Sequence, residues 1–249
     1  MLVHKLNCQG INVISVVGGG GKTSTIRRLA QELNSLGKKV IVTTTTRLGA
    51  AEALSYKHRL LTSQFPPGKD LTNQELPDRE LLLVGSVQDA DKFVGIAPEE
   101  VDLLHGRDRE RYLLVEADGA AKKPFKAPAA QEPVIPRSSQ LVIAVVGAWA
   151  LGLPLNADYF HRPHLIARLT GLSLDEPLTV EAAATVILHR EGYRKGIPAG
   201  AGFAVLINGI DANKVARARQ LAKYLKQSGV ERVLLTNVRQ EPPVVEAIV

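Results

Sequence analysis

The hydrophobic residues of the chain fall into short continuous runs, separated by longer segments in which they recur at helical spacing. The continuous runs are rich in valine, isoleucine and leucine, which is typical of strands buried on both faces of a parallel sheet. They predict strands at residues 11–17, 38–43, 60–63, 81–84, 112–115, 141–146, 203–207 and 232–236. Because helical segments separate many of these strands, we expect an α/β fold with a mostly parallel central sheet and helices on both faces.

The clearest helix follows the first strand. Ile26, Leu29, Ala30 and Leu33 lie on one side of it, and charged and amide side chains lie on the other. Gly37 follows, at the position where a left-handed glycine ends many helices. Further helices are predicted at residues 98–106, 163–169, 180–190 and 212–228, and a turn at residues 65–68.

Length and composition fit one folded unit. The 249 residues are enough for a single α/β domain over residues 1–249, with residues 150–200 as a candidate helical insertion. The only cysteine, Cys8, excludes an internal disulfide. With no signal-peptide hydrophobic region and no apolar stretch long enough to span a bilayer, we expect a cytoplasmic protein that does not contact membranes.

The net charge of +6 favours anionic partners such as a nucleotide or a phosphorylated cofactor. Only 4% of the residues are aromatic, and no basic run alternates with aromatic residues as a platform for single-stranded nucleic acid would require. The composition therefore argues against nucleic acid as the main partner.

Four glycines join the first strand to the first helix, and Lys22 and Thr23 open that helix. Glycine lets backbone N–H groups approach an anion closely, and a helix N-terminus adds further N–H donors and a positive dipole end. A lysine at this position supplies charge to the outer phosphates, and a threonine hydroxyl can bind Mg²⁺. The predicted phosphate-binding residues are Gly18, Gly19, Gly20, Gly21, Lys22, Thr23 and Ser24.

The spacing of this loop is shorter than the common phosphate-loop pattern GxxxxGK[ST], which would need a glycine where Val16 stands. The pattern GxxGKT is similar to that of Mur ligases and folylpolyglutamate synthetases, which bind ATP. The likeness implies a three-layer P-loop NTPase-like fold. A flexible turn before a lysine is the alternative, but strand, loop and helix all agree with the phosphate loop.

A later strand ends in two acidic residues, Glu116 and Asp118. A phosphate-loop site needs an acid at a strand end to hold Mg²⁺ against the phosphates. We expect Thr23 and Glu116 to bind the metal, and Lys22, Glu116, Asp118 and Lys122 to act in catalysis. An ordinary Asp-Gly turn explains Asp118 but not Glu116.

Other polar residues follow predicted strands or helix starts, and each has a simpler structural explanation. Thr44, Thr45 and Arg47 are candidates for contacts with phosphate or with Mg²⁺-bound water, although threonine also favours strands. Lys123 and Lys126, with Lys122, are candidates to face a phosphorylated second substrate, although such a run can be a solvated surface. Arg162 is a candidate to reach a phosphate and His161 to carry a proton; local hydrogen bonding is the alternative for both.

The sequence Asn208-Gly209-Ile210-Asp211 resembles the NKxD base-reading motif of GTPases, with glycine in place of its lysine. We expect Asn208 to brace the loops and Asp211 to contact the base, with a helix N-cap as the alternative role of Asp211. The lone tryptophan, Trp149, is expected to be a packing residue and not a stacking platform.

Several of these segments together resemble the YqeC family. They are VVGGGGKTST at 16–25, VIVTTTTR at 40–47, LLVEADGAAKKPFKAP at 113–128, HRP at 161–163 and NGID at 208–211. The resemblance implies a nucleotide-binding accessory factor for a selenium-dependent molybdenum hydroxylase. It implies a molybdopterin-type cofactor and a client hydroxylase as partners.

These features lead to three hypotheses about function. The first is a Mg²⁺-dependent hydrolase of ATP or GTP, or a phosphoryl- or nucleotidyl-transfer enzyme. The second is a Mur-like ATP-dependent ligase, for whose extra substrate domains the chain has little room. The third is a nucleotide-gated chaperone that uses hydrolysis only as a switch.

Overall fold

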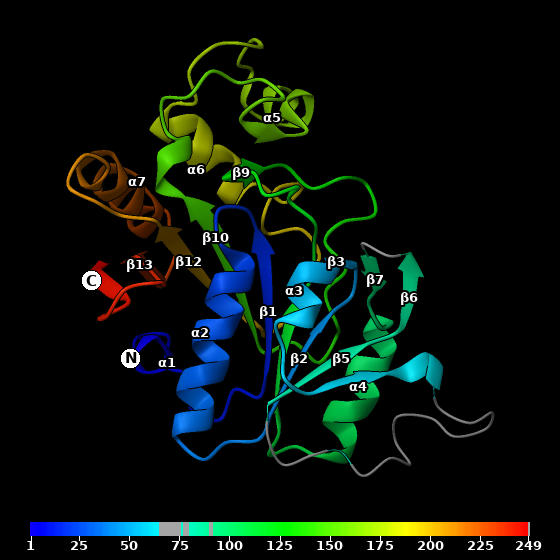
Figure 1. The fold of residues 1–249 in the computed structure, drawn as a ribbon. Helices are drawn as coiled ribbons and strands as arrows, with labels where there is room; N and C mark the ends of the chain where they lie inside the picture. Colours follow the sequence, from blue (N-terminus) through cyan, green and yellow to red (C-terminus); the bar gives the residue numbers. More distant parts are fainter. Residues whose placement is uncertain (65–75, 77–79, 90–91, 249) are drawn as a thin grey trace.

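A computed structural model describes residues 1–64, 76, 80–89 and 92–248. Its main feature is a nine-stranded sheet with the strand order β14-β13-β12-β10-β1-β8-β2-β5-β4 (Figure 1). Neighbouring strands are parallel in every pair except one: β13 and β14, at one edge of the sheet, are antiparallel. The strands are β1 Val13–Gly18, β2 Val40–Thr44, β4 Arg59–Leu61, β5 Leu81–Val84, β8 Tyr112–Glu116, β10 Leu141–Gly147, β12 Gly202–Asn208, β13 Arg232–Thr236 and β14 Val244–Ile248.

Helices cover both faces of this sheet because both faces are apolar. Along β1, Ile14 and Val16 belong to one hydrophobic cluster, and Val13 and Val17 belong to the other. The first cluster includes side chains of α1 Leu2–Lys5, α2 Lys22–Ser35 and α3 Ala50–Leu54. The second includes side chains of α4 Pro98–Arg107, α6 Val180–Leu188 and α7 Val215–Gln227. The predicted α/β fold with a mostly parallel central sheet is therefore confirmed.

Shorter elements extend this framework. Strands β3 Arg47–Gly49, β7 Lys92–Val94 and β6 Ser86–Asp89 form an antiparallel sheet, and β9 Phe125–Lys126 pairs with β11 Phe160–His161. The remaining elements are the 3-10 turns η1 Thr62–Gln64 and η3 Ala148–Ala150 and helix α5 Pro163–Thr170. The strand predicted at 60–63 is shorter than expected, since β4 ends where η1 begins, and the turn predicted at 65–68 lies outside the described residues.

The segment between η3 and β12 holds the two predicted helices, α5 and α6. Helix α5 lies at the outer end of the molecule in Figure 1, beyond the carboxyl end of β10. Helix α6 packs into the main core, where Ala183, Ala184, Val186 and Ile187 are completely buried. This segment is thus anchored in the core by α6.

The carboxyl ends of four neighbouring strands lie together. The backbone register sets Gly18 of β1 beside Val145 of β10, and Gly147 of β10 beside Asn208 of β12. On the other side of β1, Val16 pairs with Glu116 of β8. Loops that follow these strands therefore meet at one edge of the sheet, where ligands of parallel sheets gather.

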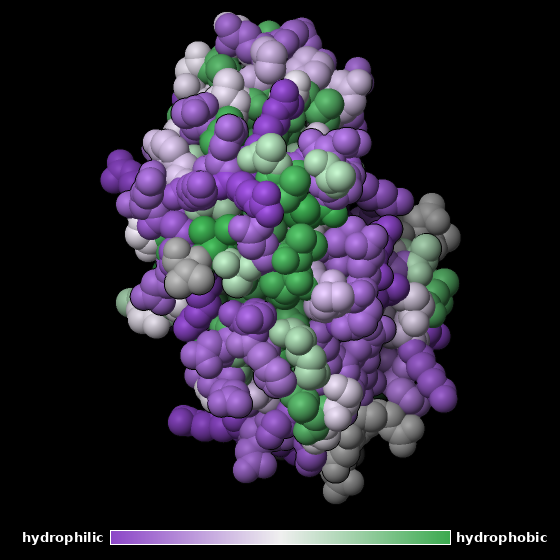
Figure 2. Space-filling model, turned by 90° about the vertical axis from the view of Figure 1, so that its left-hand side faces the viewer, coloured by the Kyte–Doolittle hydropathy of each residue, from purple (hydrophilic) through white to green (hydrophobic). Residues whose placement is uncertain are grey.

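The side of the molecule that holds both chain ends shows a band of hydrophobic residues between hydrophilic areas (Figure 2). Exposed apolar residues of the elements on this side include Tyr224 of α7 and Val245 of β14.

Within the described residues, no helix combines the length and apolar character needed to cross a bilayer. Cys8 is buried without a disulfide partner, and burial raises the pKa of its thiol to about 12.

Candidate functional site

The glycine loop joins β1 to α2, and its backbone conformation requires glycine. Gly18, Gly20 and Gly21 have φ values of 96°, 77° and 130°, a region that residues with a Cβ rarely adopt. A Cβ on Gly20 would lie 2.2 Å from the backbone nitrogen of Gly147, and one on Gly19 would lie 2.7 Å from the carbonyl oxygen of Lys123. The loop therefore packs directly against the end of β10 and the segment that follows β8.

The N–H groups of the first three glycines are already used within the protein. That of Gly18 donates to the carboxylate of Asp118, that of Gly19 to the carbonyl oxygen of Val145, and that of Gly20 to the carbonyl oxygen of Lys123. This corrects the expectation that Gly18, Gly19 and Gly20 present their N–H groups to phosphate. These bonds instead hold the loop in place.

The free donors begin at the next residue, Gly21. Among the described residues, no acceptor contacts the backbone N–H groups of Gly21, Lys22, Thr23 or Ser24. They are the last loop residue and the first turn of α2, where a helix leaves its N–H groups unpaired. The anion-binding geometry is therefore that of a helix N-terminus approached through a glycine.

The ammonium group of Lys22 lies in a buried ionic cluster. Its Nζ donates to the carbonyl oxygen of Gly18 at 2.9 Å and lies 3.3 Å from Oδ1 of Asp118 and 3.4 Å from Oε1 of Glu116. Burial alone would lower the pKa of Lys22, but the two carboxylates outweigh burial and raise it. Lys22 is therefore charged at neutral pH.

Glu116 also contacts Thr23, whose hydroxyl donates to Oε2 of Glu116 at 2.9 Å. A hydroxyl and a carboxylate are hard oxygen ligands of the kind that Mg²⁺ prefers, so this pair fits the metal in its chemistry. Within the part of the chain that the structure describes, no group of three or more His, Cys, Asp or Glu side chains is arranged to hold a metal ion. Further ligands would have to be water or phosphate oxygens.

Asp118 connects this cluster to a second one. Its Oδ2 lies 3.1 Å from Nζ of Lys126, which also contacts Oε2 of Glu132 at 2.5 Å. Glu132 in turn pairs with both terminal nitrogens of Arg162. Lys22, Asp118, Lys126, Glu132 and Arg162 thus form a continuous chain of alternating charges.

Lys126 and Arg162, two candidates for contacts with phosphorylated ligands, both pair with carboxylates of the protein. Lys126 is completely buried, so its ammonium group does not face a second substrate. Arg162 has a positive φ of 61° and donates to the carboxylate of Glu132, which is the local hydrogen bonding considered as the alternative to a phosphate contact. Both cations are needed to neutralise buried carboxylates.

Glu132 was not identified from the sequence, and its environment is unusual. Burial acts to raise the pKa of its carboxyl, but hydrogen bonds from Arg162 and Lys126 outweigh that effect and lower the pKa to about 2. His161 lies beside this cluster; burial and then the charge of Arg162 lower its pKa, which favours the neutral imidazole.

The threonines that follow β2 also use their hydroxyls within the protein. Thr44 donates to the carbonyl oxygen of Glu116 at 2.8 Å, and Thr45 donates to that of Val134 at 2.6 Å. These bonds tie the end of β2 to the end of β8 and to the segment after it. The two hydroxyl protons expected to contact phosphate are therefore engaged by backbone oxygens.

The remaining predicted cations lie at the surface of this edge. Arg47 and Lys122 are exposed, and Lys122 has a positive φ of 60°. Lys123 is partly buried, and its Nζ donates to the carbonyl oxygen of Asp158 at 2.5 Å. Of the predicted lysines, Lys122 is thus the one whose side chain extends into solvent.

Asn208 connects the glycine loop with the end of β13 and the residues after it. Its Nδ2 donates to the carbonyl oxygen of Gly20 at 2.9 Å, and its Oδ1 accepts from the hydroxyl of Thr236 and the N–H of Val238. Asp211 is exposed, accepts the N–H groups of Asn213 and Lys214, and pairs with the ammonium of Lys214, which lowers its pKa. In the structure the N-cap of α7 is Lys214, so Asp211 is not the helix N-cap considered for it but holds the turn before the helix.

Glu52 on α3 is a second residue that the sequence did not indicate. It lines a small cavity with Thr23, Thr43 and Glu116, and its Oε1 is buried without a hydrogen-bond partner among the described residues. Burial, and then the charge of Glu116, raise the pKa of its carboxyl to about 7. Glu52 therefore adds a proton-binding group beside the predicted metal ligands.

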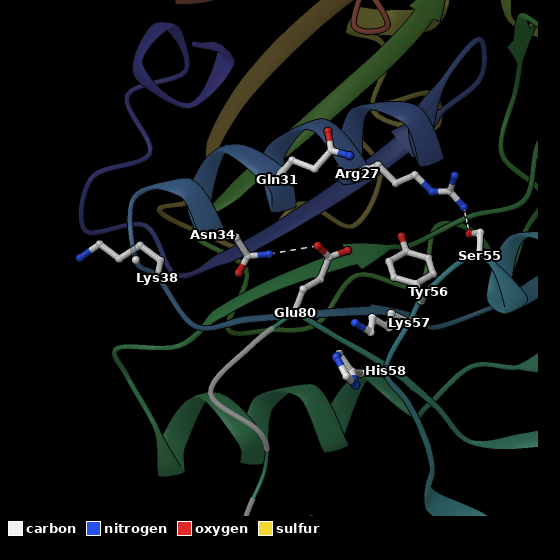
Figure 3. A pocket seen from close by; sticks show the side chains of 10 residues that line it. Arg27, Gln31, Asn34, Lys38, Ser55, Tyr56, Lys57, His58 and Glu80 are labelled. Atoms are coloured by element: carbon white, nitrogen blue, oxygen red, sulfur yellow. Dashed lines mark hydrogen bonds between the residues drawn. The ribbon is translucent and has the colours of Figure 1, made fainter.

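A larger cavity, of about 630 Å³, lies along the outer side of α2. In Figure 3, Arg27 points toward Ser55 next to Tyr56, and Asn34 reaches Glu80 from the same helix. The cavity is lined by Arg27, Gln31, Asn34, Gly37, Lys38, Ser55, Tyr56, Lys57, His58 and Glu80. None of these residues belongs to the glycine loop or to the ionic cluster. The candidate site is therefore not this large cavity but the start of α2, where Lys22, Thr23 and Glu116 lie together.

The sequence matches a protein family model and a relative from Escherichia coli. The family model for YqeC protein matches residues 14–164. Uncharacterized protein YqeC of Escherichia coli (strain K12) is 33% identical over 245 residues, covering 95% of this chain and 91% of that protein.

A solved structure to which this chain is weakly similar is that of FtsY. FtsY from Mycoplasma mycoides is 14% identical, and the match covers 92% of this chain with a TM-score of 0.34. The chain spans 52% of that FtsY chain, about half of its length. A likeness this weak does not bear on function.

The raised pKa of Glu52 predicts a pH-dependent effect of the substitution Glu52→Gln. Between pH 4.5, the ordinary pKa of glutamate, and about pH 7, the folded protein keeps a proton that the unfolded chain has lost. Glu52 therefore weakens folding increasingly as the pH rises through that window. We expect Glu52→Gln to raise the free energy of unfolding at pH 8 by on the order of 2 kcal/mol, allowing for partial exposure, and to change it little at pH 4.5.

Urea denaturation at the two pH values measures this effect. Glu231→Gln, a substitution of an exposed glutamate, is the matched control and should change neither value. An equal shift at both pH values would show that Glu52 does not titrate as described.

The buried ion pairs of Lys126 predict a large loss of stability on Lys126→Met. This change leaves the carboxylates of Asp118 and Glu132 without their shared cation, which costs about 3–5 kcal/mol in comparable buried pairs. Urea denaturation near pH 7 measures the loss. Lys122→Met, at an exposed lysine four residues away, should cost less than about 0.5 kcal/mol; a similar small cost at Lys126 would contradict the buried network.

Proposed function

The chain belongs to the YqeC family, and we propose that it binds ATP or GTP with Mg²⁺ and hydrolyses the nucleotide or transfers part of it. The finer proposal is that this reaction serves the maturation of a selenium-dependent molybdenum hydroxylase, with a molybdopterin-type cofactor and the client enzyme as partners. One observation carries the proposal: a charged lysine, four free N–H groups and a hydroxyl–carboxylate pair converge at the start of α2.

The proposed binding mode uses the free donors of the helix start. The N–H groups of Gly21, Lys22, Thr23 and Ser24 would bind phosphate oxygens, helped by the positive end of the α2 dipole. The ammonium of Lys22 would exchange its contacts with Glu116 and Asp118 for contacts with the outer phosphates. Its buried position means that this exchange happens away from bulk water, where charge interactions are stronger.

Two carboxylates beside a triphosphate would repel it unless a cation lies between them. Thr23 and Glu116 would hold Mg²⁺ there, and the metal would neutralise charge on the transferred group. Glu52, which lines the same small cavity, would accept a proton near neutral pH. Lys122 would remain available to a phosphorylated second substrate at the surface of the site.

A second function, the nucleotide-gated chaperone, is favoured by the chain of charges. Asp118 contacts Lys22 on one side and Lys126 on the other, and Lys126 leads through Glu132 to Arg162 at the start of α5. Withdrawal of Lys22 toward a phosphate would change the balance of charge around Asp118 and Lys126. Nucleotide binding could then be transmitted to α5 without any transfer reaction.

Titration with ATP, GTP and CTP in the presence of Mg²⁺ tests the proposal. Free phosphate, pyrophosphate and nucleoside diphosphate should be followed with and without molybdopterin. Release of diphosphate with no cofactor-dependent product supports the switch, and a product carrying phosphate or nucleotide supports the transferase. No binding of any of the three nucleotides would contradict both.

Lys22→Ala removes the proposed contact with the outer phosphates. We expect nucleotide affinity to fall at least about 30-fold, because loss of a buried charge contact costs about 2–5 kcal/mol. Calorimetric titration measures the affinity, and circular dichroism shows whether the variant is folded. Lys223→Ala on the exposed side of α7 is the matched control; undiminished affinity in a folded Lys22→Ala variant would remove the phosphate-loop assignment.

Glu116→Gln tests the metal site with little change in shape. The glutamine can still accept the hydrogen bond from Thr23, but it carries no charge for Mg²⁺. We expect the Mg²⁺ concentration for half-maximal nucleotide binding to rise about tenfold or more, as for other losses of metal support. An unchanged Mg²⁺ dependence would assign the metal to other residues.

A further inference from the structure

Trp149 lies between the glycine loop and the segment Asn208 to Asp211. It belongs to η3, directly after β10, and β10 pairs with β1 on one side and with β12 on the other. The glycine loop follows β1, and the segment Asn208 to Asp211 follows β12. The tryptophan is therefore held at the same edge of the sheet as the free donors of α2.

The six-membered ring of Trp149 covers the backbone of two glycines. A Cβ on Gly209 would lie 2.4 Å from Cζ3 of the ring, and a Cβ on Gly147 would lie 3.0 Å from Cη2 and Cζ2. The distance at Gly209 is too short for any other residue type while the ring stays in place, and at Gly147 a Cβ would also lie 2.8 Å from Cβ of Pro124. The absence of side chains at Gly147 and Gly209 thus leaves room for this part of the indole.

Gly147 and Gly209, which contact the ring, are connected to the glycine loop by close contacts. The N–H of Gly147 donates to the carbonyl oxygen of Pro124 at 2.8 Å, and Gly20 packs against Gly147 so closely that a Cβ would clash. Asn208, next to Gly209, donates to the carbonyl oxygen of Gly20. The position of the ring relative to the phosphate loop is therefore set by close backbone contacts and by the buried side chain of Asn208.

Trp149 nevertheless remains 38% exposed. The contacts of Trp149 with Gly209 and Gly147 agree with the expectation that it is a packing residue. Its exposed part is free to make a further contact. An exposed, rigidly held aromatic ring is suited to stacking on another flat ring.

We propose that Trp149 is the stacking platform for the base of the bound nucleotide. This inference rests on the proposed function, because the phosphates must first bind at the start of α2. Stacking accepts any aromatic base, and a larger ring system gains more contact. The site would therefore take purine nucleoside triphosphates in preference to pyrimidine ones and would bind them more tightly than a triphosphate without a base.

The chain contains a single tryptophan, so its fluorescence reports on this site alone. Addition of ATP or GTP with Mg²⁺ should change the emission of Trp149, since a stacked base alters the surroundings of the indole. Inorganic tripolyphosphate, which has no base, should bind at the same loop with a much smaller change. An equal change with both ligands would overturn the stacking role.

Variants separate stacking from packing. Trp149→Leu should weaken ATP or GTP binding about 5- to 150-fold and leave tripolyphosphate affinity unchanged, while Trp149→Phe should keep most of the nucleotide affinity. Tyr224→Leu, at an exposed aromatic residue of α7, is the matched control and should change neither. Calorimetric titration with both ligands measures these affinities.

The outcomes distinguish this inference from the proposed function. Equal weakening of tripolyphosphate and nucleotide by Trp149→Leu would mean that the ring only supports the loop, and unchanged nucleotide affinity would mean that the base lies elsewhere. Either result overturns the stacking role and leaves the phosphate site standing. If the unmodified protein binds neither ligand, the proposed function fails and the stacking role fails with it.

Discussion

The buried ammonium group of Lys22 is the constraint on which this site depends. A cation taken out of water must be paired, and Lys22 is paired by Glu116 and Asp118 and by the carbonyl oxygen of Gly18. Since both acids come from the end of β8, that strand must lie directly beside β1, as it does. The loop, the helix start and the order of the central strands thus follow from one requirement for charge balance.

Asp118 extends that requirement beyond the loop. Its carboxylate accepts the N–H of Gly18 and contacts the ammonium groups of both Lys22 and Lys126. One acid therefore fixes the backbone of the glycine loop and the charge of two lysines. Because Lys126 is completely buried and also needs Glu132, a change at Lys22 alters the balance of the whole cluster. This coupling gives the site a physical route to the segment around Arg162.

The sequence predicted the parts of the structure that depend on local pattern. The strands β1, β2, β8, β10, β12 and β13 are buried on both faces and read as continuous apolar runs, and α2 shows its periodicity over several turns. Short elements such as α3 and β9 carry too few residues to show a period. Glu132 could not be recognised because its partner Arg162 lies 30 residues away, and Glu52 because its neighbours Thr23 and Glu116 come from other elements.

Two glycine positions illustrate why residue type was easier to predict than role. Gly20 was expected to let phosphate approach, yet the space at its Cα is taken by Gly147 and its N–H by Lys123. Gly209 departs from the lysine of the NKxD motif because the ring of Trp149 occupies the space of its side chain. In both cases glycine is required by a neighbouring segment that is remote in the sequence.

The most direct test of the central claim is a crystal structure of the protein with Mg²⁺ and a nonhydrolysable nucleoside triphosphate. The account predicts phosphate oxygens on the N–H groups of Gly21 to Ser24, the ammonium of Lys22 turned from Glu116 to phosphate, and the metal between Thr23 and Glu116. A nucleotide bound elsewhere, for instance in the cavity along the outer side of α2, with Lys22 still paired to Glu116 and Asp118, would contradict it.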